Sequence, residues 1–225
     1  MGCSCGPDVV EDGLVLCLDA ANNRSYPGTG TTWTDLVGSN NGTLTNGPTF
    51  DSANGGSIVF DGSDDRVSIP LASLPTPQNS TNLTYEAVVK FDTIGGSFKT
   101  IFSQNDGTGT GKILLAASRS ADRVCTLVTG TQIQYSISDL ATNTVFTIAL
   151  GISGTNIYLG LNGVLQLVNT NSFSYTGNGE INIGTSPGAA GHFLDGNVFA
   201  ARVYNRFLST DELRQNHEAT VGRYQ

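Results

Sequence analysis

Alternation of apolar and polar residues at every second position runs through most of the sequence. In LTYEAVVKF, residues 83–91, the odd positions are apolar, whereas Thr84, Glu86 and Lys90 share the opposite face with Val88. Successive side chains of a β-strand point to opposite faces of a sheet, so this segment is predicted to be a half-buried strand. Many similar runs follow one another without helical segments between them, whereas parallel strands would need long crossovers. The chain is therefore predicted to be all-β, with two antiparallel sheets.

The connections between these runs are typical of tight turns, and one helix is predicted near the end of the chain. The run NIYLGL is followed by Asn162-Gly163, a pair that suits the two positive-φ positions of a type I′ hairpin turn. Ser209 is followed three residues later by Glu212, which is the spacing of a helix capping box. We therefore predict one short C-terminal helix over residues 209–219, anchored by Leu213 and lying against the rim of the sandwich.

The composition favours a single domain. Of the 225 residues, 28 are glycine, 38% are apolar and only 13% are charged, which is typical of short strands joined by many tight turns. The longest hydrophilic stretches, at residues 73–82 and 103–111, are short enough to be loops, so no linker between domains is indicated. We expect a leader at residues 1–12 without a core-forming pattern, followed by one domain at residues 13–225.

The charge of the chain argues against several kinds of partner. The formal net charge is −8, from 19 acidic and 11 basic residues, and the sequence contains no basic run. Such a surface repels phosphate backbones, so nucleic acid is not an expected partner. The sequence has neither an apolar run of about 18 residues nor a basic start followed by an apolar core. We therefore expect no membrane partner and no secretory signal, with synthesis in a cytosol.

The four cysteines are Cys3 and Cys5 in the leader and Cys17 and Cys125 in strand-like runs. Disulfides are rare in cytosolic proteins, so we expect free thiols, two of them buried. The Cys-x-Cys pair of the leader would need two further ligands for a tetrahedral zinc site, and the sequence has only two histidines. A zinc site is therefore not expected.

An acidic turn interrupts two strand-like runs in GSIVFDGSDDRVSIP, residues 56–70. Its carboxylates belong to Asp61, Asp64 and Asp65, and two interpretations are open. Aspartate accepts local amide hydrogen bonds in turns and glycine takes left-handed conformations, which favours a structural turn. A hard cation with six to eight oxygen ligands would instead relieve the repulsion among three carboxylates. The structural turn is preferred, and calcium bound by Asp61, Asp64 and Asp65 is the alternative. No other cofactor is expected.

The acidic residues are not arranged for glycoside hydrolysis. Retaining glycosidases need two carboxylates about 5 Å apart, which on a strand requires acids at alternating positions. The five glutamates are isolated from one another, and Glu86 is expected to face Lys90 rather than a second acid. Arg202 and Tyr204 share one strand face, and without an identifiable histidine partner we interpret them as a solvated or packing pair. The sequence therefore predicts no catalytic residues and a protein that is not an enzyme.

Two aromatic residues, Tyr26 and Trp33, are candidate platforms for sugar stacking. Trp33 lies within TTWTDL, where a large ring is more often part of a hydrophobic core. We therefore expect Trp33 in the core and assign no ligand-binding residue from the sequence.

Five blocks of the sequence resemble successive segments of LamG-like domains, which have the concanavalin A-like jelly-roll fold. The blocks are DGLVLCLDAANNRSY, TTWTDLVGSNNGTLTNGPTF, SIVFDGSDDRVSIP, TIALGISGTNIYLGLNGVLQ and LDGNVFAARVYNRFLSTDEL. The last block is the most specific, because family members end on a strand similar to VRIYNRAL followed by a capped helix. The resemblance covers about residues 12–219 and implies a two-sheet antiparallel jelly-roll sandwich.

The resemblance does not extend to a calcium site that many relatives carry. These relatives bind calcium through an acid in the last strand, in a sequence similar to IDEVRIYN. Here VFAARVYN places Phe199 and Ala200 at the two acidic positions. The calcium site of the family is therefore not expected in this chain.

The opening block and NNGTLTNGP are similar to versions of this domain in structural proteins of tailed phages, especially marine ones. This implies a non-enzymatic virion protein, either a capsid decoration or a tail or fibre component, with glycan adhesion as a secondary role. A free carbohydrate-binding lectin is the alternative, and an unusual polysaccharide-active enzyme is the third hypothesis. A virion protein is made in the host cytoplasm but meets the outside after lysis, which favours the first. We expect residues 1–12 to attach the protein to other virion proteins in an oligomeric or assembly-bound state.

Overall fold

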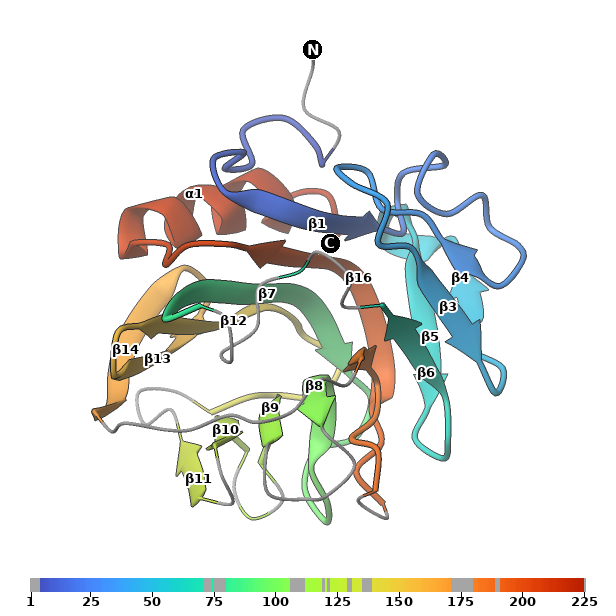
Figure 1. Ribbon diagram of the computed structural model, residues 1–225. Helices are drawn as coiled ribbons and strands as arrows, with labels where there is room; N and C mark the ends of the chain where they lie inside the picture. Colours follow the sequence, from blue (N-terminus) through green and yellow to red (C-terminus); the bar gives the residue numbers. More distant parts are fainter. Residues whose placement is uncertain are drawn as a thin grey trace.

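The structure is a computed structural model in which two antiparallel sheets face each other as a sandwich (Figure 1). It describes residues 5–70, 74, 80–105, 112–118, 120, 122–128, 131–134, 139–170, 180–188 and 191–224. One α-helix, α1 (Thr210–Val221), lies near the end of the chain. The predicted all-β architecture, with two antiparallel sheets and one C-terminal helix, is confirmed.

Sheet A is built around two long strands that lie side by side, β7 (Asn82–Phe91) and β16 (Asp195–Tyr204). Beyond β7, the order is β12 (Val145–Ser153), β13 (Asn156–Leu161) and β14 (Val164–Thr170). On the other side, β16 pairs with β5 (Ser57–Asp61) through its first half and with β1 (Leu14–Asp19) through its second half. A short strand, β4 (Thr49–Asp51), pairs with β5, and the 3-10 helix η1 (Ala53–Gly55) connects the two.

Sheet B faces sheet A across the core. Its order is β11 (Thr131–Gln134), β10 (Val124–Val128), β9 (Lys112–Ala117), β8 (Lys99–Asn105), β15 (Ile181–Ile183), β6 (Arg66–Ile69), β3 (Gly42–Thr45) and β2 (Thr32–Trp33). The chain passes from sheet A to sheet B between β5 and β6. The acidic turn therefore lies where the two sheets are joined.

The core between the sheets is filled by side chains that the two-residue pattern predicted to be apolar. Ile148, Leu150 and Ile152 of β12 alternate along the strand and all belong to this core. Trp33 of β2 is fully buried in it, as expected. The turn after β13 has φ angles of +49° at Asn162 and +79° at Gly163, which the predicted type I′ turn requires.

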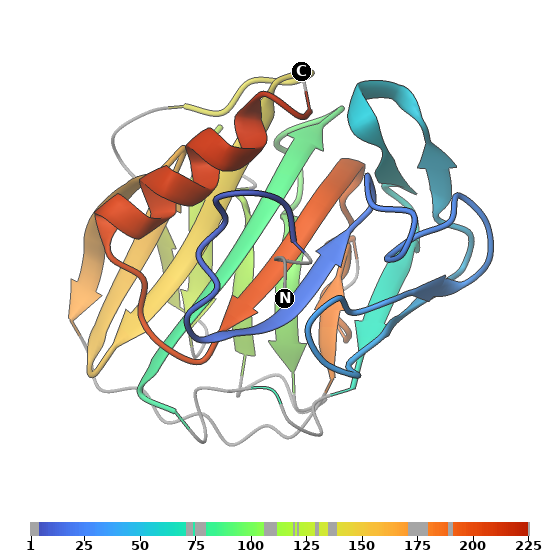
Figure 2. The same cartoon turned by 90° about the horizontal axis from the view of Figure 1, so that it is seen from above.

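A third layer covers the outer face of sheet A, and it was not predicted. The helix α1 and the segment of residues 5–13 lie over this face (Figure 2). Val9 and Val10 pack with Leu208 and Leu213 in one buried cluster. Consequently β7 is buried on both faces, and the prediction of a half-buried strand is wrong. The predicted position of the helix at the rim is also wrong, because its apolar side closes over the sheet.

The predicted capping box of α1 is confirmed. The Ser209 hydroxyl accepts a hydrogen bond from the Glu212 N–H, and the Glu212 carboxylate accepts one from the Ser209 N–H. Capping satisfies backbone donors that the first turn of a helix leaves unpaired. No helix among the described residues has both the length and the apolar character needed to span a membrane.

The cysteines differ from the expectation of free thiols. Cys5 and Cys17 form a disulfide, with their Cα atoms 6.2 Å apart. The segment of residues 5–13 folds back over β1, and this brings two cysteines that are 12 residues apart in sequence into one buried cluster. Cys125 is free and buried, as expected. Cys3 lies outside the described residues, as does much of the two predicted loops at residues 73–82 and 103–111.

Candidate functional site

The acidic turn brings its three predicted residues together. Asp61 is the last residue of β5, and Asp64 and Asp65 come directly before β6. One carboxylate oxygen from each of the three lies within 4.8 Å of the others. Asp61 and Asp64 are exposed, whereas Asp65 is buried.

Hydrogen bonds within the turn involve two of the three carboxylates. Asp65 Oδ2 accepts from the Asp61 N–H at 3.1 Å, and Asp61 Oδ1 accepts from the Ser63 N–H at 2.8 Å. Gly62 has φ +76°, a left-handed conformation that favours glycine. Burial raises the pKa of the Asp65 carboxyl, the Asp61 N–H opposes this rise, and the charges of Asp61 and Asp64 add to it. These bonds join residues within the turn itself, and its purely structural role stays a prediction.

A fourth carboxylate lies next to the turn. Asp195, the first residue of β16, is directly opposite Asp61 in the sheet, and its Oδ2 accepts a hydrogen bond from the Thr93 hydroxyl at 2.6 Å. The donor set here is purely oxygen, which suits a hard cation such as calcium. Asp61, Asp64 and Asp65 could each supply one oxygen to such an ion. Calcium at this turn stays a prediction.

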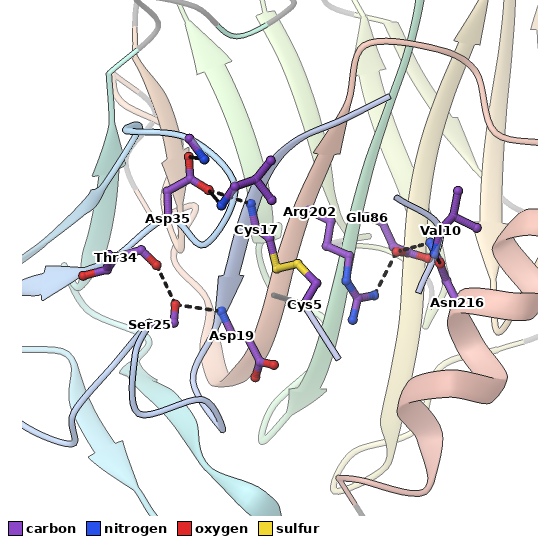
Figure 3. The surroundings of a disulfide bond; sticks show 12 residues. Cys5, Val10, Cys17, Asp19, Ser25, Thr34, Asp35, Glu86, Arg202 and Asn216 are labelled. Atoms are coloured by element: carbon purple, nitrogen blue, oxygen red, sulfur yellow. Dashed lines mark hydrogen bonds and ion pairs between the residues drawn. A yellow bond between two sulfur atoms is a disulfide. The ribbon is translucent and has the colours of Figure 1, made fainter. Parts of the chain in front are cut away.

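A second group of charged residues lies in the middle of sheet A (Figure 3). Glu86 of β7 and Arg202 of β16 are directly opposite each other, and Arg202 Nη1 donates to Glu86 Oε2 at 3.0 Å. Both side chains are buried, with 0% and 1% of their areas exposed. Burial raises the pKa of Glu86, and the charge of Arg202 opposes this. The expectation that Glu86 faces Lys90 is therefore wrong, because Lys90 pairs with Asp92 at 3.2 Å.

The helix and the N-terminal segment complete the surroundings of this ion pair. Asn216 of α1 donates to Glu86 Oε2 at 2.9 Å and to the Tyr204 hydroxyl at 2.9 Å. The Val10 N–H donates to Asn216 Oδ1 at 2.8 Å. Arg202 and Tyr204 are thus held in one buried polar network and are not solvated.

The aromatic candidates for sugar stacking are not accessible. Trp33 is fully buried, and Tyr26 has 2% of its area exposed. The Tyr26 ring packs on Phe50 at 5.5 Å between centroids, and its hydroxyl donates to the Gly30 carbonyl at 2.8 Å. Phe199, at one of the acidic positions of the family pattern, packs on Tyr224 with ring centroids 5.0 Å apart. These five rings have structural roles in the described part of the chain.

The outer face of sheet B carries a polar strip that the sequence analysis missed. We define the polar strip as Thr43, Thr45, Arg66, Ser68 and Asn182. Thr43 lies opposite Ser68, which lies opposite Asn182, and the Ser68 hydroxyl donates to Asn182 Oδ1 at 3.1 Å. Thr45 lies opposite Arg66 on the same face. Each of these residues alternates with a core residue such as Leu44 or Val67, so their side chains point away from the core.

The polar strip is open to solvent at one end. Thr43 is exposed, Thr45, Arg66 and Ser68 are half-buried, and Asn182 is buried. The guanidinium of Arg66 has no hydrogen-bond or ion-pair partner among the described residues. Hydroxyl, amide and guanidinium groups in one row are donors and acceptors suited to sugar hydroxyls. The sequence signal in RVSI and INI was their alternating polar residues, Arg66, Ser68 and Asn182. This alternation does not predict which residues of neighbouring strands lie opposite each other.

Comparison with known proteins identifies the fold family of the chain. A family model described as the concanavalin A-like lectin/glucanases superfamily matches residues 61–214. Among curated protein sequences, none matches the chain.

Solved structures share the fold at low sequence identity. Domain 4 of a GH43 extracellular arabinanase from Geobacillus stearothermophilus, in complex with arabinotriose, is 16% identical with a TM-score of 0.71, over 92% of this chain and 100% of that chain. Trypanosoma rangeli sialidase is 18% identical with a TM-score of 0.68, over 91% of this chain and 32% of that chain. The binding domain of botulinum neurotoxin serotype D is 12% identical with a TM-score of 0.67, over 93% of this chain and 52% of that chain. The chain thus spans about a third of the length of the sialidase chain that it matches.

Proposed function

Because the chain belongs to the concanavalin A-like lectin/glucanase superfamily, we propose that it is a non-enzymatic structural protein displayed on a phage particle, where the polar strip contacts glycans. The display on a particle rests on the resemblance of the opening block and of NNGTLTNGP to phage structural proteins. Glycan contact is the secondary role. A free lectin is the alternative, and it shares the same glycan-binding face.

The arrangement of Glu86 supports a function without catalysis. Glu86 lies in the middle of the long strand β7 and is fully buried. Its charge is balanced by Arg202, and Asn216 donates to the same carboxylate oxygen. A general acid must be within hydrogen-bonding reach of the substrate, which this carboxylate is not.

The disulfide is the structural observation that supports a function outside the cell. Structural disulfides persist on secreted proteins and on virion surfaces and are rare in proteins that stay in a reducing cytosol. The Cys5–Cys17 bond therefore fits a protein whose working environment is outside the cell. A particle protein that is made in the cytoplasm and released by lysis would reach that environment.

Attachment to the particle needs a surface other than the covered face of sheet A. Residues 5–12, which we expected to hold the protein on other virion proteins, pack on the domain itself. Asp8, Glu11 and Asp12 remain on the outside of this segment, and the Gln215 side chain of α1 donates to the Asp8 carbonyl. We propose that partner proteins bind this outer side of the leader together with α1.

Electron microscopy of purified particles labelled with an antibody against the domain tests the display. We expect label at one fixed position on the particle. Particles that carry no label, together with free protein in the lysate, would leave the free lectin as the better account.

A glycan array tests the polar strip. Arg66→Ala and Thr43→Ala should each weaken binding about fivefold or more, since each removes a hydrogen-bonding group worth about 1 kcal/mol. Arg214→Ala is the matched control, because Arg214 lies on α1 over sheet A, on the opposite side of the molecule. Equal loss in all three variants, or release of reducing ends from the bound polysaccharide, would contradict the proposal.

A further inference from the structure

The guanidinium of Arg202 uses only part of its hydrogen-bonding capacity. Nη1 donates to Glu86 Oε2, but neither Nε nor Nη2 has an acceptor among the described residues. Nε and Nη2 form the edge with which an arginine usually binds a planar acceptor through two parallel N–H groups. Only 1% of the Arg202 side-chain area is exposed, so bulk solvent does not reach this edge.

A complementary acceptor lies on the partner of Arg202. Glu86 Oε2 accepts from both Arg202 and Asn216, whereas Oε1 of the same carboxylate has no donor among the described residues. Two donors and one acceptor are thus left over on two side chains that already contact each other. In folded proteins most buried polar atoms have a partner, either in the protein or in an ordered water molecule.

The charges of Arg202 and Glu86 limit which kind of molecule can form hydrogen bonds with these unpaired atoms. Arg202 and Glu86 balance each other, so an anion at the arginine edge would leave an uncompensated negative charge in a buried place. A cation at Oε1 would leave an uncompensated positive charge. Water is neutral, accepts from Nε or Nη2 and donates to Oε1, and a polar site with two to four partners is what a buried water requires.

We propose that Arg202 and Glu86 form an internal water-binding site beneath the third layer of the protein. One water molecule accepts from the Nε and Nη2 edge of Arg202, and water also donates to Glu86 Oε1. Asn216 of α1, Val10 and Cys5 lie beside the ion pair (Figure 3), and both of its side chains are closed to solvent. Water here binds side chains of β7 and β16 beneath the layer that covers them.

A crystal structure of the full chain at a resolution that shows ordered solvent tests this site. We expect a water molecule about 2.7–3.2 Å from Nε or Nη2 of Arg202. We also expect a water molecule within hydrogen-bonding distance of Glu86 Oε1. The proposal is overturned if protein acceptors occupy that edge, or if no solvent density lies within hydrogen-bonding distance of it. A bromide soak that gives an anomalous peak there would also overturn it, since the site would then hold an anion.

Nuclear magnetic resonance in solution gives an independent readout. The Nε–H of Arg202 should show a cross-peak to a long-lived water and should exchange slowly with the solvent. Arg214, whose side chain is 52% exposed, is the matched control and should exchange fast. Exchange of Arg202 as fast as that of Arg214 would contradict a closed internal site.

Discussion

Glu212 shows how a single residue couples the end of the sheet to the helix. Its carboxylate accepts from Arg206 Nη2 at 2.6 Å and from the Ser209 N–H at 2.8 Å. The hydrogen bond from Arg206, followed by that from Ser209, lowers the pKa of Glu212 from its usual 4.5 to about 2. The charged form of this side chain therefore stabilises the junction between β16 and α1.

The effect of Glu212 should depend on pH in a defined direction. A carboxyl whose pKa is lower in the folded state contributes stability above its unfolded pKa and loses it as the pH falls through the folded pKa. We expect Glu212→Gln to lower the free energy of unfolding by about 1–2 kcal/mol at pH 7. Urea unfolding should show this difference shrinking between pH 4.5 and about 2. A difference that stays constant over this range would contradict the assignment.

Asp64 and Asp65 should behave differently when they are replaced. Asp65→Ala removes the acceptor of the Asp61 N–H and should lower the free energy of unfolding by about 1 kcal/mol. The exposed Asp64→Ala is the control within the same turn and should change it by less than about 0.5 kcal/mol. If the turn is structural, millimolar calcium should change the melting temperature of both variants and of the parent chain only slightly. A strong rise in the parent chain that Asp64→Ala abolishes would instead establish the calcium alternative.

At the scale of elements, the third layer is the feature that local patterns predicted least well. The capping box was predictable because Ser209 and Glu212 are three residues apart, and the strands were predictable because their periodicity is local. Glu86 and Arg202 are 116 residues apart, and only the pairing of β7 with β16 places them together. For the same reason the polar strip could not be predicted, because it depends on the register of β3, β6 and β15.

The N-terminal segment should matter for stability because of its disulfide and its buried side chains. Cys5→Ala should lower the free energy of unfolding by about 2–4 kcal/mol, the usual contribution of a disulfide that closes a loop. Deletion of residues 1–12 should cost more, since it also removes Val9 and Val10 from their cluster. These effects are measured by urea unfolding with and without a reductant.

The controls for this prediction come from the other cysteine that the structure describes. Cys125→Ala should keep the response to reductant, because Cys125 is not part of the disulfide. Cys5→Ala should have lost that response. If the parent chain is equally stable in its oxidised and reduced forms, the N-terminal segment is held by packing alone.

At the scale of the whole molecule, the two outer faces of the sandwich differ in a way that supports display. Sheet A is covered by α1 and the N-terminal segment, and the disulfide joins the N-terminal segment to β1. Sheet B carries the polar strip, which reaches solvent at Thr43 on the opposite side of the molecule. A domain whose sheet A is closed by a third layer, and whose sheet B has a polar end that reaches solvent at β3 and β6, is suited to hold its place on a particle while it contacts glycans.

Quantitative mass spectrometry of gradient-purified phage particles tests the display of this protein most directly. We predict a fixed number of copies per particle, and a non-reducing digest in which the peptides of Cys5 and Cys17 are linked. Particles that lack the protein, while the lysate contains it in soluble form, would contradict the proposed function.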